Sequence, residues 1–280
     1  MRRLIALSLF VLPALAARSD DRDWKIEERE TITRTFKVAA GENVSKLMVD
    51  QLNGYIHVTG GAGSEIQVTV EKHIRAESKA ALADAKKDVK YDMTQQGNAV
   101  KLYEDGPFRS HNRGDDHYGY RVTFDCEIQV PAGASLDLHT LNSAIEVKSS
   151  TGDFDVRTLN GRVNMEEIGG SGKAATQNGG VKVGFSRNPA HESSFRTQNG
   201  PIDVYFHSSP DANLSLETMN GGVYSDFDVT TIPTTVKGQI SGSRFIYRSG
   251  GNMKVRAGKG GPELSFHTMN GSIRLHSKSI

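Results

Sequence analysis

Carboxylates in the second half of the sequence are the side chains whose spacing could support catalysis. Asp153 and Asp155 share one face of an expected strand, Asp203 lies further along, and Asp226 and Asp228 form another alternating pair. Enzymes that cleave polysaccharides use two carboxyl groups that converge on the substrate. No second acidic pair follows at the sequence period described below. The sequence therefore predicts no catalytic residues and a protein that is not an enzyme.

Histidine and aspartate are densest in one polar stretch, residues 111–117. It reads His111-Asn112-Arg113-Gly114-Asp115-Asp116-His117. Two imidazoles and two carboxylates could hold a divalent metal, but this spacing matches no closed structural site. We predict no metal site and no cofactor, and the sequence leaves open whether the 111–117 loop binds a metal.

Cys126 is the only cysteine, which excludes a disulfide within the chain. It lies in an alternating stretch, in phase with Phe124 and Ile128. That phase predicts a thiol packed in the core. A reactive thiolate would need a neighbouring base, which the sequence does not identify.

A short motif, Thr-x-Asn-Gly followed by apolar residues, recurs along most of the chain. Its central asparagines are Asn53, Asn142, Asn160, Asn178, Asn199, Asn220 and Asn270. The glycines that follow them are Gly54, Gly161, Gly179, Gly200, Gly221 and Gly271, whereas Ser143 follows Asn142. From Asn142 to Asn220 the steps are 18, 18, 21 and 21 residues, a period that indicates a repeat architecture.

Each copy of the motif lies between two alternating segments. Leu136 and Leu138 precede one turn, and Ile145 and Val147 follow it. Period 2 is typical of a strand with one buried face, and Asn-Gly favours a tight turn because both residues tolerate a positive φ. Two short strands and two turns make one rung, which must stack to bury its apolar side. We predict an all-β fold, a β-solenoid of stacked 18–21-residue rungs with T-x-N-G turns.

The motif residues are interpreted as structural. The threonine and asparagine have the parity of the apolar residues, so both are expected to point inward at the corner. Stacked asparagines at one strand spacing, about 4.8 Å, can hydrogen-bond from rung to rung as a ladder. The outer faces are expected to be flat and solvated, without a cleft that brings two carboxylates together.

The N-terminus predicts export. Residues 1–17 contain Arg2-Arg3, an apolar run and an Ala14-Leu15-Ala16 cleavage signal, which is the pattern of a signal peptide. No later apolar run is long enough to span a bilayer. Without the two signal arginines the chain is near neutral, which gives no argument for nucleic-acid binding. We expect an exported protein of the periplasm or the cell surface, with no transmembrane segment in the mature chain.

The remaining segments suggest a single domain. Residues 18–40 are expected to form a charged lead-in and a first strand, and residues 41–280 the solenoid. The alanine-rich stretch 77–90 favours a helix, and residues 91–103 favour a hairpin around Gly97. This helix–hairpin insertion, about 75–118, separates the first copy of the motif from the others.

The order of these elements resembles a known group. The shared features are the export signal, the Leu52-Asn53-Gly54-Tyr55-Ile56 stretch, the alanine-rich helix, the Ile128 to Gly133 segment and the T-x-N-G rungs. The chain resembles the bacterial putative-adhesin β-strand-repeat domains of unknown function, which are similar to head GIN domains. This resemblance implies a β-solenoid of the cell envelope and supplies no reaction.

Three functions remain open at this point. The favoured one is a non-catalytic adhesin or scaffold that acts through its solenoid faces, with an unknown envelope protein or polysaccharide as partner. The alternatives are a carbohydrate-active β-helix enzyme, a polysaccharide lyase or hydrolase, and a periplasmic partner of an envelope-stress signalling protein.

Overall fold

The computed structural model describes residues 24–38, 45–109, 118–232, 239–241, 244–246 and 252–277. The expected signal peptide and the 111–117 loop lie outside the described residues.

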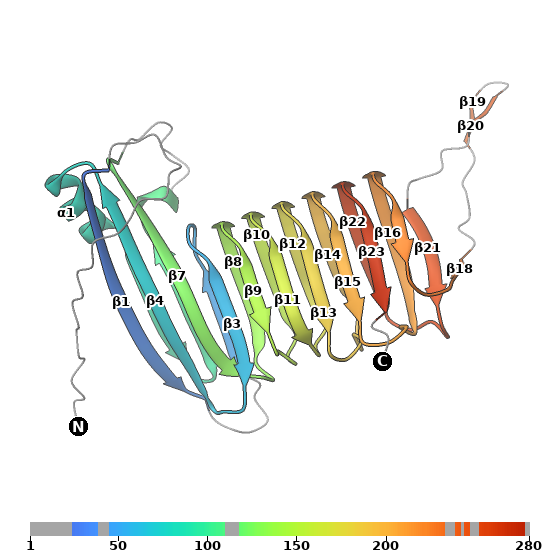
Figure 1. Cartoon of the computed structure of the whole chain (residues 1–280), viewed down its shortest axis with the longest axis horizontal. Helices are drawn as coiled ribbons and strands as arrows, with labels where there is room; N and C mark the ends of the chain where they lie inside the picture. The colour runs from blue at the N-terminus through green and yellow to red at the C-terminus, as the bar shows by residue number, and fades with distance from the viewer. Residues whose placement is uncertain are drawn as a thin grey trace.

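Two long sheets face each other along the molecule (Figure 1). Sheet A has the spatial order β1 (Ile26–Lys37), β4 (Glu65–Ala76), β7 (Tyr120–Pro131), β3 (Ile56–Gly61), β9 (Ile145–Lys148), β11 (Val163–Ile168), β13 (Val181–Phe185), β15 (Ile202–Phe206), β23 (Ile273–Ser277) and β17 (Val223–Ser225). Sheet B has the order β18 (Val229–Thr231), β21 (Asn252–Ala257), β16 (Ala212–Asn220), β22 (Glu263–Asn270), β14 (Ser193–Asn199), β12 (Gly172–Asn178), β10 (Phe154–Asn160), β8 (Ser135–Asn142), β2 (Lys46–Asp50), β6 (Ala99–Asp105) and β5 (Lys90–Gln96). The short elements β19 (Gln239–Ser241), β20 (Arg244–Ile246) and η1 (Pro107–Arg109) lie outside both sheets.

Most neighbouring strands of the stack are parallel and in register. Thr158 of β10 lies opposite Thr140 of β8 on one side and Thr176 of β12 on the other. The described chain is therefore mostly β, with a solenoid-like stack of two parallel-rich sheets, as the repeat predicted.

The core lies between the two sheets. In the strands of the central rungs, alternate residues point inward and are buried, as the period-2 pattern predicted. Near the C-terminal end, aromatic rings continue from rung to rung, with the Phe195 and Phe266 ring centroids 5.1 Å apart. Since each rung is too small to bury these side chains alone, stacking supplies the core.

The spatial order of the last two rungs is the reverse of their order in the sequence. Strands β22 and β23 come last in the sequence, yet β22 lies between β14 and β16, and β23 lies between β15 and β17 (Figure 1). The asparagines therefore stack as Asn199, Asn270 and Asn220. The sequence spacing did not predict this order.

The N-terminal end differs from the expected insertion. Strand β6 pairs with β2 in parallel, so the expected insertion extends sheet B rather than leaving the stack, and β7, which follows it, pairs with β3 in parallel in sheet A. Strand β1 begins at Ile26, inside the expected charged lead-in, and pairs with β4 along its whole length.

One α-helix, α1 (Lys79–Asp88), lies beside β4 and β7 in the described chain. Ser78 caps its N-terminus by accepting a hydrogen bond from the Ala81 amide at 3.1 Å. Its buried face consists of Ala81 and Ala85. The helix and the β5–β6 hairpin confirm the elements expected from the sequence.

Candidate functional site

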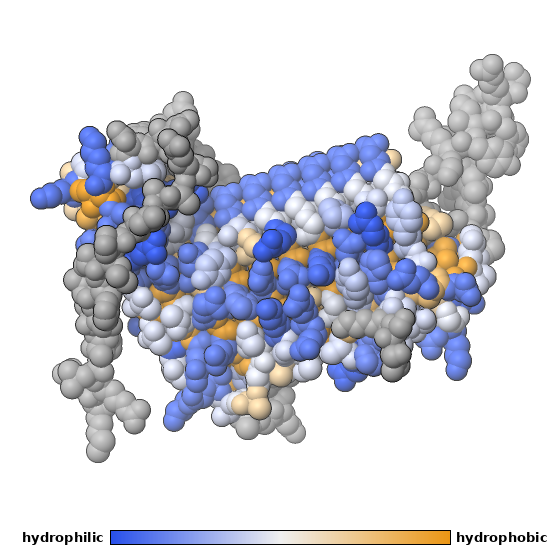
Figure 2. Space-filling model, viewed as in Figure 1, coloured by the Kyte–Doolittle hydropathy of each residue, from blue (hydrophilic) through white to orange (hydrophobic). Residues whose placement is uncertain are grey.

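The asparagines of the motif form a ladder along one corner of the stack. Each Nδ2 donates to the Oδ1 of the asparagine in the preceding rung, at distances from 2.7 to 3.1 Å. The donor–acceptor pairs are Asn142–Asn53, Asn160–Asn142, Asn178–Asn160, Asn199–Asn178, Asn270–Asn199 and Asn220–Asn270. Figure 2 shows the hydrophilic ridge along this edge.

The expected inward orientation of the asparagines is wrong. Six of the seven are exposed, and Asn53 is partly exposed. Alternation ends at the threonine because the backbone turns the corner there, so that Leu141 and Asn142 are both exposed.

The threonines point inward and form a second column. Thr176 Oγ1 donates to the Gly161 carbonyl of the preceding rung at 2.7 Å, and Thr197 Oγ1 donates to the Gly179 carbonyl at 2.7 Å. Thr158, Thr268 and Thr218 make the equivalent bond. Side-chain hydroxyls thus satisfy buried carbonyls at the corner.

The motif glycines are required by close stacking rather than by a common positive φ. A Cβ at Gly161 would lie 1.9 Å from the Ser143 carbonyl oxygen, and one at Gly221 would lie 2.0 Å from that of Gly271. Neither residue has a positive φ, which corrects the expectation from turn geometry. Gly179 does have one, with φ of 155°.

The first rung has a different corner, built from the buried residues Gln51, Glu104 and Cys126 together with Tyr91. Gln51 Nε2 donates to the carbonyls of Gly54 at 2.7 Å and Phe124 at 3.0 Å. Tyr91 Oη donates to Gln51 Oε1 at 3.0 Å and lies 3.1 Å from Cys126 Sγ.

Burial controls the chemistry of this cluster. It raises the pKa of the Cys126 thiol to about 12, so the thiol is protonated and unreactive, as its buried phase predicted. Burial also raises the pKa of Glu104, against the lowering effect of the Leu52 and Asn53 amides. Glu104 Oε2 accepts from the Leu52 amide at 2.5 Å. These groups therefore stabilise the end of the stack rather than perform chemistry.

The outer face of sheet B carries the clearest arrangement of charged groups. Asp137 of β8 and Asp155 of β10 lie in register on neighbouring strands. Lys46 Nζ lies 3.1 Å from Asp137 Oδ2, and Arg157 binds both oxygens of Asp155 at 2.6 and 2.5 Å. Each carboxylate thus has its own cation.

His139 lies beside both carboxylates, and its Nε2 atom has no hydrogen-bond partner among the described residues. Its Nε2 atom is 3.3 Å from Asp137 Oδ1 and 4.0 Å from Asp155 Oδ1. The two carboxylate oxygens are therefore at most about 7.3 Å apart, the sum of these distances.

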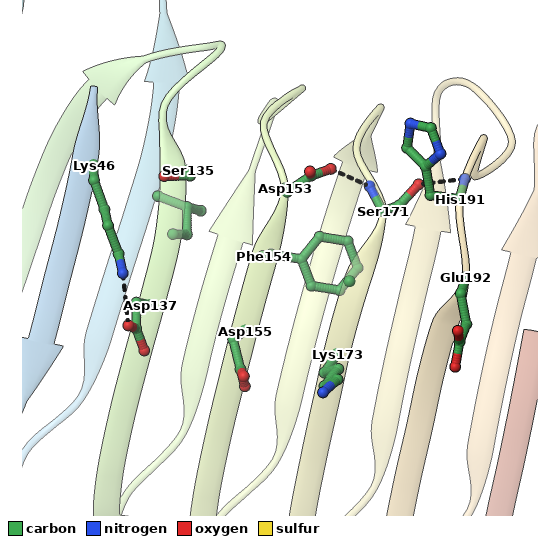
Figure 3. Close-up of a pocket in the computed structure, with 12 residues that line it drawn as sticks. Lys46, Ser135, Asp137, Asp153, Phe154, Asp155, Ser171, Lys173, His191 and Glu192 are labelled. Atoms are coloured by element: carbon green, nitrogen blue, oxygen red, sulfur yellow. Dashed lines mark hydrogen bonds and ion pairs between the residues drawn. The ribbon is translucent and has the colours of Figure 1, made fainter. Parts of the chain in front are cut away.

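Asp137 and Asp155, but not His139, border an open groove of about 490 Å³ (Figure 3). Its lining includes Asp137, Asp155, Lys46, Lys173 and Glu192. A second groove on the same face, about 250 Å³, is lined by Arg196, Ser215, Glu217, Ser265, Phe266 and His267. The expectation of a flat face without neighbouring carboxylates is therefore wrong for sheet B.

The acidic residues selected from the sequence do not form one site. Asp153 accepts a hydrogen bond from the Ser171 amide at 3.1 Å and borders the larger groove. Asp203 lies in sheet A, where Arg274 Nη1 donates to it at 3.2 Å. Asp226 is 3.1 Å from His276 Nδ1. Asp137 was missed, although it precedes Asp155 by one 18-residue step.

Among the described residues, no group of three or more His, Cys, Asp or Glu side chains could hold a metal ion. None of the helices described is long and apolar enough to cross a bilayer.

These features place the protein in a structural class: mostly β, solenoid-like stacks with an asparagine ladder and a charged face that carries grooves. No protein-family model matches the sequence, and no curated protein sequence matches it either.

Solved structures of bacterial proteins are similar over most of the chain. One is a putative cell adhesion protein from Clostridium sporogenes, with 12% identity, a TM-score of 0.39, and coverage of 89% of this chain and 100% of the other. A putative adhesin from Bacteroides fragilis has 11% identity, a TM-score of 0.31, and coverage of 88% and 97%. A putative adhesin from Parabacteroides distasonis has 9% identity, a TM-score of 0.30, and coverage of 88% and 97%. Because these TM-scores are low, no functional conclusion follows from them.

Proposed function

We propose that the protein is an exported, non-catalytic scaffold or adhesin of the cell envelope that binds an extended polysaccharide along the outer face of sheet B. The observation that carries this proposal is the pair of open grooves on one face, where polar side chains repeat from strand to strand. Strands spaced about 4.8 Å apart present carboxylate, hydroxyl and cationic groups at regular intervals to a polymer lying across them.

The charges on this face suit a polar ligand without a large net charge. Asp137 and Asp155 are each paired with a cation, so the larger groove offers acceptors and donors together. Sugar hydroxyls can use both. The proposal of an exported protein rests on the N-terminal sequence pattern alone.

The exposure of the groove argues against catalysis. About a third of each aspartate side chain is solvent-accessible, at 33% for both Asp137 and Asp155. Catalytic carboxyl groups gain their shifted pKa values and electrostatic strength in sites that exclude water. This groove does not exclude water.

One observation keeps a carbohydrate-active enzyme as a second candidate. The upper bound of about 7.3 Å between these carboxylate oxygens is compatible with the separation of about 5–9.5 Å that glycosidases use. His139 lies between them as a further proton carrier. An enzyme of this kind would lose turnover when either aspartate is changed.

A binding and turnover experiment separates the two candidates. The purified protein is applied to a glycan array and to isolated cell walls, and the same polysaccharides are screened for cleavage. The double variant Asp137→Asn/Asp155→Asn should bind at least tenfold more weakly. Asp203→Asn is the matched control, because it is also paired with an arginine but lies on sheet A. It should bind normally.

Two results would contradict the proposal of a non-catalytic protein that binds polysaccharide in this groove. Equal weakening by Asp203→Asn would mean that the groove is not the binding site. Polysaccharide cleavage by the wild type that Asp137→Asn or Asp155→Asn abolishes would show an enzyme instead.

A further inference from the structure

The two sheets end differently at the C-terminal side of the stack. Strand β21 pairs antiparallel with β16, and β18 pairs with β21, so sheet B continues past the last rung. Sheet A ends at β17, and no described strand pairs with its outer edge. The next rung is therefore only half built in the described part of the chain.

Backbone groups of β17 face outward at this edge. The Ile273 amide donates to the Gly222 carbonyl at 2.9 Å. In a parallel ladder this pattern turns the N–H and C=O of Val223 away from β23. Inside the stack the equivalent Val181 amide donates to Pro201 of the next rung at 3.0 Å. The backbone N–H and C=O of Val223 thus point outward, and in the inner rungs the equivalent groups bond to the next strand.

Within the described part of the chain, no asparagine donates to the last acceptor of the ladder. Asn220 Nδ2 donates to Asn270 Oδ1 at 2.7 Å, in the same direction as every other bond of the ladder. Asn220 Oδ1 consequently occupies the place where the next asparagine would donate. A further strand that carries an asparagine at this level would extend the ladder.

Apolar side chains are exposed around the missing half rung. Met253 of β21 lies opposite Leu216, whose side chain is buried, so both point to the core side of sheet B. Met253 is nevertheless 41% exposed, and Val229 of β18 is 39% exposed. Tyr224 of β17 is 59% exposed. Figure 2 shows hydrophobic surface at this end of the molecule.

We propose that the outer edge of β17 is a strand-addition site for an extended segment of another protein. The segment would lie parallel to β17 and bond to the outward groups of Val223. Its inward side chains would cover Met253 and Val229, and its asparagine would donate to Asn220 Oδ1. This surface differs from the polysaccharide-binding face in position and in the class of its partner.

A second copy of the chain is a poor occupant. The N-terminal end of the stack finishes in β1 and β5, which pair antiparallel with their neighbours and do not contain the motif. Two copies therefore cannot continue the parallel stack from head to tail, and we assign the foreign strand to a different polypeptide.

A labelled peptide copied from residues 197–206 tests the site, because this sequence already contributes a parallel rung. Fluorescence anisotropy with the purified protein should show saturable binding. Val223→Pro removes the outward amide and should weaken binding at least tenfold. Val223→Ala keeps that amide and should bind within threefold of wild type. Both variants should unfold at similar temperatures, because the stack does not use the Val223 amide.

Two further measurements examine the geometry. A peptide with Asn199→Leu should bind at least threefold more weakly because it cannot extend the ladder. In amide hydrogen exchange, Val223 should exchange rapidly in the free protein and at least tenfold more slowly with peptide bound. Val181 should be protected in both states.

Several outcomes would overturn the proposal. They are no saturable binding, equal binding by Val223→Pro and Val223→Ala, and slow exchange of Val223 in the free protein, which would mean that the chain covers its own edge. A dimer that Val223→Pro dissociates would assign the edge to a second copy instead.

Discussion

Between β10 and β15 the same threonine and asparagine contacts close each corner of the stack, whereas the first rung uses Gln51 and Glu104 instead. In the middle, Thr176 donates to the carbonyl of the preceding rung and Asn178 continues the ladder. At the first rung, Gln51 takes the place of the threonine, and Glu104 accepts from the Leu52 amide.

The difference follows from what lies on each side of a rung. An inner rung finds its hydrogen-bond partners in a copy of itself, so one solution serves throughout. The first rung has no copy beneath it, and its amides need an acceptor from elsewhere. The Glu104 carboxylate of β6 supplies that acceptor, so the end of the regular stack is closed by a residue that is not part of the repeat.

The largest expected effect comes from breaking the close contact in the middle of the stack. Gly161→Val should lower the free energy of unfolding by about 3 kcal/mol, because its Cβ would overlap the Ser143 carbonyl. Gly133→Val is the matched control, since a Cβ there meets nothing within 4 Å. Urea unfolding followed by circular dichroism measures both, and equal stability of the two variants would contradict the stacking role.

Removing the Glu104 acceptor at the first rung should lower the free energy of unfolding by a somewhat smaller amount. Glu104→Leu removes the acceptor of the Leu52 and Asn53 amides and should cost about 2 kcal/mol of unfolding free energy. Glu104→Gln keeps an oxygen at this place and should cost less than about 1 kcal/mol. Chemical denaturation of both variants checks the order, and a larger loss in Glu104→Gln would count against the acceptor role.

Glu104 should also make the stability of the wild type depend on pH. Burial raises the pKa of Glu104 above its ordinary value of 4.5, so the folded protein holds this proton more tightly than the unfolded chain. This contribution to stability is present below pH 4.5 and is lost as the pH rises through the raised folded pKa. Between pH 4 and 7, wild type should therefore lose stability relative to Glu104→Gln. Melting temperatures across this range test it, and a constant difference would contradict the shift.

The smallest effect compares two threonines. Thr176→Val removes the bond to the Gly161 carbonyl and should cost about 1 kcal/mol. Thr140 Oγ1 is buried without a partner, since Gln51 already donates to the carbonyl that Thr140 would use. Thr140→Val should therefore be neutral or slightly stabilising in the same unfolding assay. Equal losses at both positions would remove the distinction between the middle and the end.

The repeated part of the fold could be predicted from sequence because its contacts join equivalent positions. Alternation located the buried residues, and the motif located the corners. The orientation of Asn142 could not be predicted from the alternation of inward and outward side chains, because that alternation holds only while the strand continues. Gln51 and Glu104 could not be predicted, because each has partners more than 50 residues away in unrelated segments.

The candidate site was only partly predictable. Asp155 was identified, but its neighbour Asp137 was not, although the 18-residue step relates them. The spatial order of the final rungs could not be predicted from the sequence for a different reason. The copies at Asn220 and Asn270 present the same residue types to Asn199, so either could pair with it by pattern alone.

The reversed order of the last rungs has a consequence for how the stack formed by β16, β17, β22 and β23 can fold. In a solenoid stacked in sequence order, each coil could settle as soon as it was synthesised or exported. Here β16 and β17 cannot find their inner neighbours at once, because β22 and β23 come later in the sequence. The segment from Glu263 to Ser277 therefore completes the stack from within, and a chain that stops before Glu263 would lack an interior coil rather than an outer one.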